Sequence, residues 1–403
     1  MNRVLVTGMG LITALGCDPE TFWAALLAGK SGAKPVTRFD ARSYSTNIGA
    51  EIVDFDPAAY FDRKAARRMS RASLLGLYAA KQALQDACLR SRREGERIGV
   101  FIGSSQGGFV ESEPYFFHSK PSPMALLKPM NSAPASNISI QFNLTGPSIT
   151  MDTACSSASH AIGTAMMMIQ SGKIDKAVVG GTDTVFSRDV YRSWCSLGAL
   201  SRQNDVPEKA CKPFSKTRDG TVLGEGSAML VLEAEHSARK RRAKIYAEVA
   251  GYGFSSDAHH ITHPTSQGMA AAIEHGLVDA GIAPVEVDYV NAHGTGTQVN
   301  DRLETAAFKQ VFGDLAYQVP MSGIKAAVGH TLAASGAIEA IACALAIQTG
   351  CIPPTINYEE ADPDCDLDYV VSGPRSQEVN VCLSNSFAFG GSNVSLVITK
   401  YED

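Results

Sequence analysis

"DTACSSASHAIG" (residues 152–163) places Cys155 at the head of a run of serines, alanines and glycine, where an apolar helix is predicted to begin. Small and apolar residues recur beyond it with helical spacing, and the pattern ends near Gly172. A helix N-terminus presents free N–H groups and a partial positive charge, which lower the pKa of a thiol and favour a nucleophilic thiolate. The alternative is a buried cysteine that acts as a small hydrophobe.

The composition is that of an ordinary folded protein with a sizeable core. The chain has 403 residues, of which 45% are hydrophobic and 19% charged. A net charge of -5 gives no general attraction to nucleic acid or to an anionic membrane. The nine cysteines form no CxxC pairs, which argues against a disulfide framework or zinc ribbon and favours a reducing compartment.

The N-terminal stretch MNRVLVTGMGLITALG is interrupted by Thr7 and by glycines, so it predicts a strand and a turn rather than a signal peptide. No apolar run reaches the ~20 residues that a membrane-spanning helix needs. We therefore expect a cytoplasmic enzyme.

Strand-like segments alternate with helix-like segments along the chain, which is typical of a layered α/β fold. The predicted strands are RVLVTG, RIGVFIG, KAVVGG, AMLVLEA, IYAEVAG, DYVNAHG and VCLSN.

The sequence also suggests an internal duplication. ASHAI (158–162) resembles ASGAI (334–338) at an offset of 176, and IQSG (169–172) resembles IQTG (347–350) at 178. Such a repeat predicts two related halves. At the first offset Cys155 lies opposite Thr331, so His330 would also stand at the head of a helix.

Three further residues are candidate partners of the cysteine. His293, in NAHGTGT (291–297), follows a predicted strand, and histidines at the carboxyl ends of strands commonly point into α/β active sites. Lys325 and His330 lie five residues apart in GIKAAVGH (323–330), ahead of the second helix and its Glu339. Taken singly, a histidine or a buried Lys–Glu pair is also an ordinary structural feature.

Four ordered blocks, DTACSSASH, NAHGTGT, GIKAAVGHTLAASGAIEA and LSNSFAFGGSN, resemble the motifs of elongating β-ketoacyl synthases, the condensing enzymes of the thiolase superfamily. The resemblance extends over essentially the whole chain. It implies that Cys155 accepts an acyl group and that His293 and His330 bind the thioester carbonyl of a malonyl unit during decarboxylation. Two imidazole N–H donors would stabilise the enolate that forms. The Cys–His–His set resembles neither the Cys–His–Asn set of initiating synthases nor the paired cysteines of thiolases.

The resemblance implies roles for the surrounding residues as well. Lys325 and Glu339 would form an ion pair that orients His330. The backbone N–H of Phe389 would pair with that of Cys155 as an oxyanion hole, with Phe387 and Phe389 at the acyl gate. Ala388 stands where the family usually has glycine, and because alanine tolerates positive φ poorly we expect a less mobile gate.

Substrate contacts are implied on three loops. Thr295 and Thr297 would hydrogen-bond the phosphopantetheine arm of an acyl carrier protein, and Thr262 would line the same entrance. Gln106 lies where fatty-acid enzymes commonly carry an aliphatic residue, which predicts a shorter, unsaturated or otherwise modified acyl group.

The basic stretch RKAARRMSR (63–71) is predicted to place four cations on one helix face, namely Lys64, Arg67, Arg68 and Arg71. Such a run is usually a solvated face. Its position resembles the family's docking patch for the acidic acyl carrier protein.

Alternative functions remain open at this point. GSSQG (103–107) matches the G-x-S-x-G nucleophile elbow, so a serine hydrolase using Ser105 is a remote alternative. GMGLITALG has Thr13 at the third glycine position of a dinucleotide fingerprint and is discounted. His259 and His263 have metal-ligand spacing, but Pro264 predicts a loop and we expect no metal site. Some relatives are non-catalytic chain-length-factor subunits that lack the cysteine.

The sequence therefore predicts a thiolase-like, five-layered αβαβα sandwich of two pseudo-duplicated halves. Residues 1–245 would carry the nucleophilic cysteine and residues 246–403 the catalytic histidines. The expected reaction is decarboxylative condensation of malonyl-acyl carrier protein with an acyl group on Cys155, in fatty-acid or type II polyketide elongation. We expect no cofactor beyond the carrier-bound phosphopantetheine, and a homodimer or a heterodimer with a related ketosynthase or chain-length factor.

Overall fold

The computed structural model describes residues 2–89, 97–112 and 123–402. Ten strands form one continuous sheet in the order β10-β9-β13-β14-β8-β1-β7-β6-β4-β5. Five strands come from the first part of the chain: β1 (Val4–Ile12), β4 (Ile98–Gly103), β5 (Ser148–Met151), β6 (Lys176–Asp183) and β7 (Gly226–Ala234). Five come from the second: β8 (Ala247–Ser256), β9 (Tyr289–Asn291), β10 (Met321–Ser322), β13 (Val381–Phe387) and β14 (Ser392–Thr399). All seven predicted strands are confirmed.

The sheet has the same pairing pattern on both sides of its centre. Strands β1 and β8 meet there through a short antiparallel pairing of Leu5 with Glu248 and Val6 with Ala247. Outward from each, the next two pairings are antiparallel and the last two are parallel. The carboxyl ends of the parallel strands therefore lie at equivalent positions in the two five-strand units.

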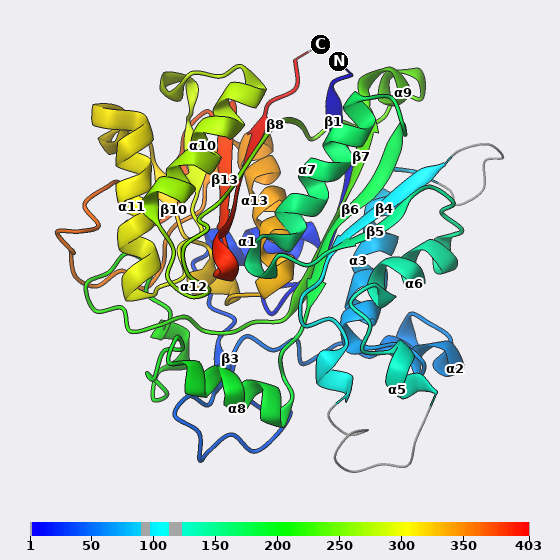
Figure 1. Cartoon of the computed structure of the whole chain (residues 1–403), viewed down its shortest axis with the longest axis horizontal. Helices are drawn as coiled ribbons and strands as arrows, with labels where there is room; N and C mark the ends of the chain where they lie inside the picture. Colours follow the sequence, from blue (N-terminus) through cyan, green and yellow to red (C-terminus); the bar gives the residue numbers. More distant parts are fainter. Residues whose placement is uncertain (1, 90–96, 113–122, 403) are drawn as a thin grey trace.

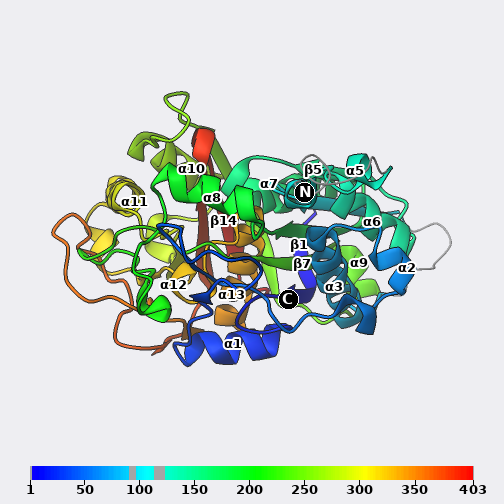
Figure 2. The same cartoon turned by 90° about the horizontal axis from the view of Figure 1, so that it is seen from below.

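Helices cover the sheet in three layers (Figures 1 and 2). Helices α7 (Ser157–Gln170) and α13 (Ser335–Thr349) lie between the two five-strand units, where α7 packs on β4 and β6, and α13 packs on β13 and β7. Helices α3 (Arg71–Asp86) and α6 (Ala133–Phe142) cover one outer face. Helices α10 (Ser266–Ala280) and α11 (Gln298–Phe312) lie on the other side. These are the five layers of the thiolase-like fold.

The remaining elements are short and lie around these layers. They are α1 (Pro19–Leu27), α2 (Arg63–Ala66), α5 (Met124–Leu127), α8 (Arg188–Leu197), α9 (Glu235–Lys240), α12 (Lys325–Val328), β2 (Lys34–Pro35), β3 (Ile48–Gly49), β11 (Cys351–Ile352) and β12 (Arg375–Ser376).

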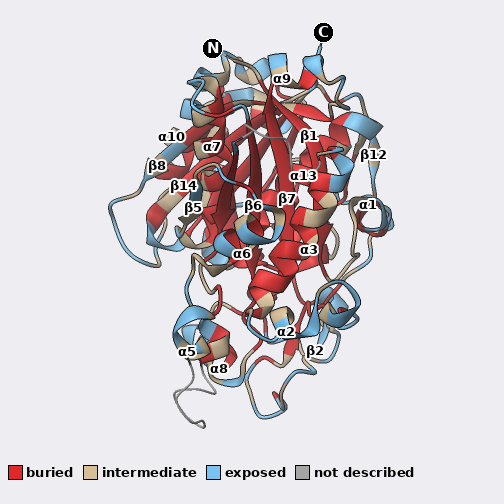
Figure 3. Cartoon of the chain, turned by 90° about the vertical axis from the view of Figure 1, so that its right-hand side faces the viewer, coloured by how far each residue is buried: buried red, intermediate tan, exposed pale blue. Residues whose placement is uncertain are grey.

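The central helix α13 explains why the sequence needs so many small residues. Its alanines and glycine allow strands and α7 to approach closely, and nearly every residue is buried (Figure 3). The segment Leu332–Thr349 is long and apolar enough to cross a membrane by composition, with a mean hydropathy of 1.5, but 83% of it is buried inside the fold. The segment is the core helix of this structure.

Both central helices begin in the same unusual way. A 3-10 turn precedes each helix, Ala154–Ser156 before α7 and Leu332–Ala334 before α13. The first residue of each turn is left-handed, with φ of 53° at Ala154 and 50° at Leu332. The structural offset between the helices is thus 178, and Cys155 corresponds to Ala333. The predicted match of Cys155 with Thr331 is wrong by two residues.

The basic stretch is not one helix face, so that prediction is also wrong. Helix α2 ends at Ala66, and α3 begins at Arg71 after a break at Ser70, whose side chain caps α3. The Arg71 guanidinium turns inward and binds the buried carboxylate of Glu225 with two contacts of 2.7 Å. Three of the four predicted cations remain exposed, namely Lys64, Arg67 and Arg68, and Arg63 is exposed beside them.

Candidate active site

Cys155 lies in the 3-10 turn at the head of α7, at the floor of a pocket formed by both units of the sheet. Its side chain is 5% exposed. The pocket is lined by Cys155, Trp194, Ala199, Thr221, His260, Ile261, Thr262, Pro264, His293, Thr295, Thr297, Val299, Asn300, His330, Phe387, Ala388, Phe389 and Gly391. The structure thus brings the predicted nucleophile, both histidines, all three threonines and both gate phenylalanines to one place.

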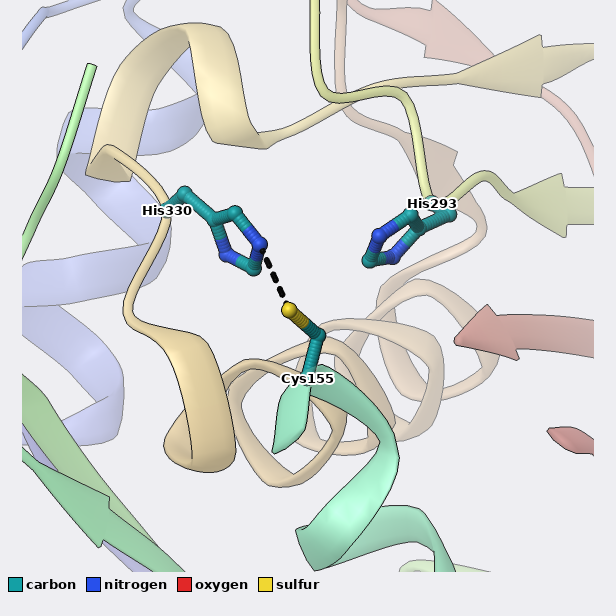
Figure 4. Close-up of side chains that lie close together, drawn as sticks. All are labelled: Cys155, His293 and His330. Atoms are coloured by element: carbon teal, nitrogen blue, oxygen red, sulfur yellow. Dashed lines mark hydrogen bonds between the residues drawn. The ribbon is translucent and has the colours of Figure 1, made fainter. Parts of the chain in front are cut away.

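His330 is the nearest partner of the cysteine. Its Nε2 lies 3.1 Å from the Cys155 sulfur (Figure 4). Its Nδ1 accepts a hydrogen bond from the backbone N–H of Leu332 at 3.3 Å. A neutral imidazole whose Nδ1 accepts must carry its proton on Nε2. His330 therefore presents an N–H donor to the pocket.

His293 faces the same space from the other side of the sulfur (Figure 4). The Lys325 Nζ donates to its Nδ1 at 3.2 Å and to its backbone carbonyl at 2.5 Å. This again leaves the proton on Nε2. The Glu304 carboxylate accepts hydrogen bonds from the backbone N–H groups of His293 and Gly294, at 2.8 and 2.9 Å, and so fixes the loop.

Lys325 and Glu339 form the predicted ion pair, which is almost fully buried. The ammonium contacts His293 rather than His330. The expected orienting role therefore falls on the other histidine. His330 is positioned instead by its backbone, which exchanges hydrogen bonds with Val222 and Gly224.

Burial dominates the ionisation of the site. It raises the pKa of the Cys155 thiol to about 12, although Lys325 and the backbone N–H of Phe389 act to lower it. Burial and then Lys325 hold the pKa of His293 and of His330 well below the ordinary range. The helix-terminus argument predicted a lowered thiol pKa, and that prediction is wrong for this buried site. Both imidazoles are neutral.

The gate loop follows β13. Phe389 is 37% exposed and stacks on Trp194, with ring centroids 6.2 Å apart. Ala388 is extended, with φ of -107°, so alanine is unstrained here. The positive φ of the loop occurs instead at Gly390 and Gly391. Trp194 was not identified from the sequence, because only the fold brings α8 beside the gate.

The threonines line the entrance. The hydroxyls of Thr295 and Thr297 are 2.9 Å apart, and Thr297 also caps α11. Thr262 lies on the loop after β8, which is tied to the gate because the Ile261 carbonyl accepts from the Gly390 N–H at 2.8 Å. The three residues can contact an extended substrate arm that enters toward Cys155.

Ser105 does not form the serine–histidine pair of a hydrolase triad within the described residues. Its hydroxyl donates to the Asp183 carboxylate at 2.7 Å, and no histidine contacts it within the described chain. Asp183 also accepts from the backbone N–H groups of Gln106, Gly107 and Ala333. Burial raises the pKa of Asp183 to about 6. The hydrolase alternative finds no support, and Asp183 and Glu304 are positioning residues that the sequence reading missed.

The convergence of the three side chains also resembles a metal site, since one ligand atom from each lies within 4.8 Å of the others. Metal-binding histidines usually donate their second N–H to a carboxylate or carbonyl. Here Lys325 donates to the Nδ1 of His293, and the Leu332 N–H donates to the Nδ1 of His330. The Nε2 of each histidine therefore carries a proton and has no free lone pair for a metal. The surroundings thus favour hydrogen-bond donation over metal binding.

The HHxxH segment is a loop, as predicted. The histidine that contacts His263 is His260, with their Nδ1 atoms 2.8 Å apart, and all three histidines are exposed. The helical arrangement that would bring His259 and His263 together, the alternative set aside above, does not occur.

Comparisons with known proteins identify the family of the chain. The family "Beta-ketoacyl synthase, N-terminal domain" matches residues 1–238, and "Beta-ketoacyl synthase, C-terminal domain" matches residues 246–359. The chain is 42% identical to the 3-oxoacyl-[acyl-carrier-protein] synthase 2 of Coxiella burnetii, covering 100% of this chain and 99% of that protein.

Solved structures are similar over the same length. The ishigamide ketosynthase/chain length factor superposes with a TM-score of 0.92 at 36% identity, covering 100% of each chain. A type II polyketide ketosynthase in complex with its acyl-carrier protein gives a TM-score of 0.89 at 31% identity, again covering 100% of each.

Fold and site together define a thiolase-like, acyl-transferring condensing enzyme. The chain belongs to the β-ketoacyl synthase family. This confirms the family and the reaction class that the four motif blocks predicted.

Proposed function

We propose that this ketosynthase joins an acyl group on Cys155 to the two-carbon unit of malonyl-acyl carrier protein. The observation that carries the proposal is the pair of neutral imidazoles, each fixed with its proton on Nε2 beside the thiol. Two fixed donors suit a reaction in which negative charge develops on one oxygen.

The first half-reaction is acyl transfer. The Cys155 sulfur attacks the thioester carbon of acyl-carrier, the carrier thiol leaves, and an acyl-enzyme thioester remains. The backbone N–H groups of Cys155 and Phe389 would bind the tetrahedral oxyanion. Because burial favours the neutral thiol, the thiol proton leaves as the sulfur attacks and passes to the departing carrier sulfur.

The second half-reaction is decarboxylation and condensation. The bond between the malonyl carboxylate and its α-carbon breaks, carbon dioxide leaves, and the electron pair becomes an enolate. The Nε2–H groups of His293 and His330 donate to the enolate oxygen, each contributing ~3 kcal/mol in the transition state. The α-carbon then attacks the acyl carbonyl and expels the Cys155 sulfur, which regains a proton from solvent. The product is a 3-ketoacyl-carrier.

The carrier would deliver both substrates. Thr295, Thr297 and Thr262 would bind its phosphopantetheine arm, and Lys64, Arg67 and Arg68 would attract its acidic surface. Arg71 is not part of this patch, because its guanidinium forms an ion pair with the buried carboxylate of Glu225. A cytoplasmic location follows from these substrates, and no cofactor enters the proposed steps.

The chain would act as a dimer. Among the described residues, edge strand β5 has no neighbour on one side, and exposed apolar side chains lie on it and on α5 and α6. They include Ile149, Ile140, Leu126 and Leu127. An exposed apolar edge strand is a ready surface for pairing with another chain. A second copy is the simplest partner, and the structure of the ishigamide ketosynthase/chain length factor makes a heterodimer the alternative.

We also propose that residues 1–245 and 246–403 are the two related halves. The first would supply the nucleophile and the second both histidines. A purely non-catalytic chain-length subunit is disfavoured because Cys155 and both histidines are present.

The acyl group is assigned by experiment. The protein is incubated with malonyl-carrier and a panel of acyl-carriers, and the mass of the acyl group on Cys155 is read by mass spectrometry. We expect acylation of Cys155 with a preferred primer. No acylation with any primer would overturn the proposal.

Gln106 is tested in the same assay. It lies in the loop held by Asp183, and we expect Gln106→Ile to shift the profile toward longer saturated acyl groups. Identical acyl-group profiles for the wild type and Gln106→Ile would mean that Gln106 does not contact the acyl group.

A further inference from the structure

A second cavity lies far from the pocket of Cys155, at the opposite end of α7. It has a volume of about 610 Å³ and opens between the first residues of β4 and β6, the end of α7 and helix α9. It is lined by Arg97, Ile98, Gly172, Lys173, Ile174, Asp175, Lys176, His236, Ser237, Lys240 and Arg241. Since α7 rises ~1.5 Å per residue over its 14 residues, about 20 Å separates the two sites.

Positive charge dominates the wall. Three of its cations, Arg97, Lys173 and Lys240, are exposed, and their side-chain nitrogens form no hydrogen bond or ion pair with the described part of the chain. Two more, Lys176 and Arg241, share one buried carboxylate, that of Glu233, at 3.6 and 2.7 Å.

Among the described residues, two acidic groups offset these five cations. Glu233 lies beneath the wall, and Asp175 lies on it, 3.4 Å from His236. The cavity is therefore strongly cationic in a chain whose net charge is -5. A concave site of this size concentrates field lines on a small anion better than a flat surface does.

We propose that this cavity binds a small phosphorylated molecule through its phosphate groups. Lysine and arginine side chains from three separate segments surround the space, which suits two or more phosphates better than a single charge. Ile98 and Ile174 supply a small apolar floor, and the His236 imidazole is the one aromatic ring that the described residues place on the wall. The phosphates, rather than a stacked base, would then supply the binding energy.

The probe is inorganic pyrophosphate, titrated into the full chain by calorimetry at low ionic strength. We expect saturable binding to one site per chain. The double variant Lys173→Gln/Lys240→Gln should weaken binding about tenfold or more, because two phosphate contacts are lost. The matched control is Lys64→Gln/Arg68→Gln, which removes two exposed cations near the other end of the molecule and should change the affinity less than about twofold. Asp175→Asn should tighten binding.

Three results would overturn the proposal. They are the absence of saturable pyrophosphate binding, equal weakening by the two double variants, and hexaglutamate binding as tight as that of pyrophosphate. The first two results would mean that the cavity has no specific phosphate site. The third would mean that it is a general surface for acidic proteins. Binding is measured without turnover, so the outcome is independent of the proposed condensation.

Discussion

At the scale of single residues, the chemistry depends on which ring nitrogen carries a proton. Lys325 and the Leu332 N–H each donate to an Nδ1, so both Nε2 atoms are donors before any substrate arrives. A site that needs no reorganisation at the moment of reaction gains most from electrostatic stabilisation. Glu339 matters because it holds the Lys325 ammonium in place.

Glu339→Gln tests this orientation. The variant leaves the buried ammonium without its counter-charge, so Lys325 shifts and His293 loses its fixed tautomer. We expect kcat to fall about 100-fold, as small displacements of reacting groups do, with little change in KM. Glu339→Asp should recover part of the loss. Nearly intact activity of Glu339→Gln, with a normal fold, would contradict the orienting role.

The thiol pKa makes a second prediction at this scale. Since burial raises the pKa of Cys155 to about 12, the thiolate fraction should increase with pH throughout the accessible range. The rate of Cys155 alkylation by iodoacetamide should rise up to about tenfold per pH unit between pH 7 and 9. A rate already constant above pH 7 would instead mean a lowered thiol pKa.

At the scale of elements, the catalytic residues are held by segments that cross between layers. The stretch 222–225 exchanges backbone hydrogen bonds with His330, and its Glu225 binds Arg71 at the start of α3. Glu225 also accepts from the Thr184 hydroxyl at 2.8 Å, next to Asp183. Buried hydrogen bonds therefore link the start of α3 to the segment that leads into α13.

Glu225→Gln is expected to lower both stability and kcat. Loss of the buried charge leaves the Arg71 guanidinium without a full partner and costs ~3 kcal/mol of unfolding free energy. The control is Glu51→Gln, another buried carboxylate, which pairs with Arg38 but not with Arg71. The midpoint temperature of thermal unfolding should fall in both variants, whereas kcat should fall mainly in Glu225→Gln. An equal loss of kcat in the two variants would contradict this and would mean that Glu225 contributes to stability only.

At the scale of the whole molecule, the alternation of strand-like and helix-like segments predicted an α/β fold and seven of the ten strands of the sheet, and the resemblance of the four motif blocks implied the layers and the site residues. What they could not predict depends on tertiary contact. Arg71 looked like a surface cation because nothing in its neighbourhood reveals Glu225, 154 residues away. Asp183, Glu304 and Trp194 were missed for the same reason. The thiol pKa was misjudged because a local helix terminus was weighed without the burial around it.

Carrier docking is tested on the intact enzyme. Reversing the charge of Lys64, Arg67 and Arg68 to Glu should raise KM for acyl-carrier about tenfold at low salt, and less at high salt. Turnover of an acyl-pantetheine thioester should not change. Lys173→Glu/Lys240→Glu, at the far end of α7, is the control and should leave both substrates unaffected. An equal loss with both substrates would contradict docking at this patch.

The most direct test of the proposed mechanism is the release of carbon dioxide from malonyl-carrier by enzyme already acylated on Cys155. The wild type is compared with His293→Ala, and acylation is confirmed by mass before malonyl-carrier is added. If the Nε2–H of His293 stabilises the enolate, acylation is retained and carbon dioxide release falls about 100 to 1,000-fold. Undiminished release from the acylated variant would contradict the proposed mechanism.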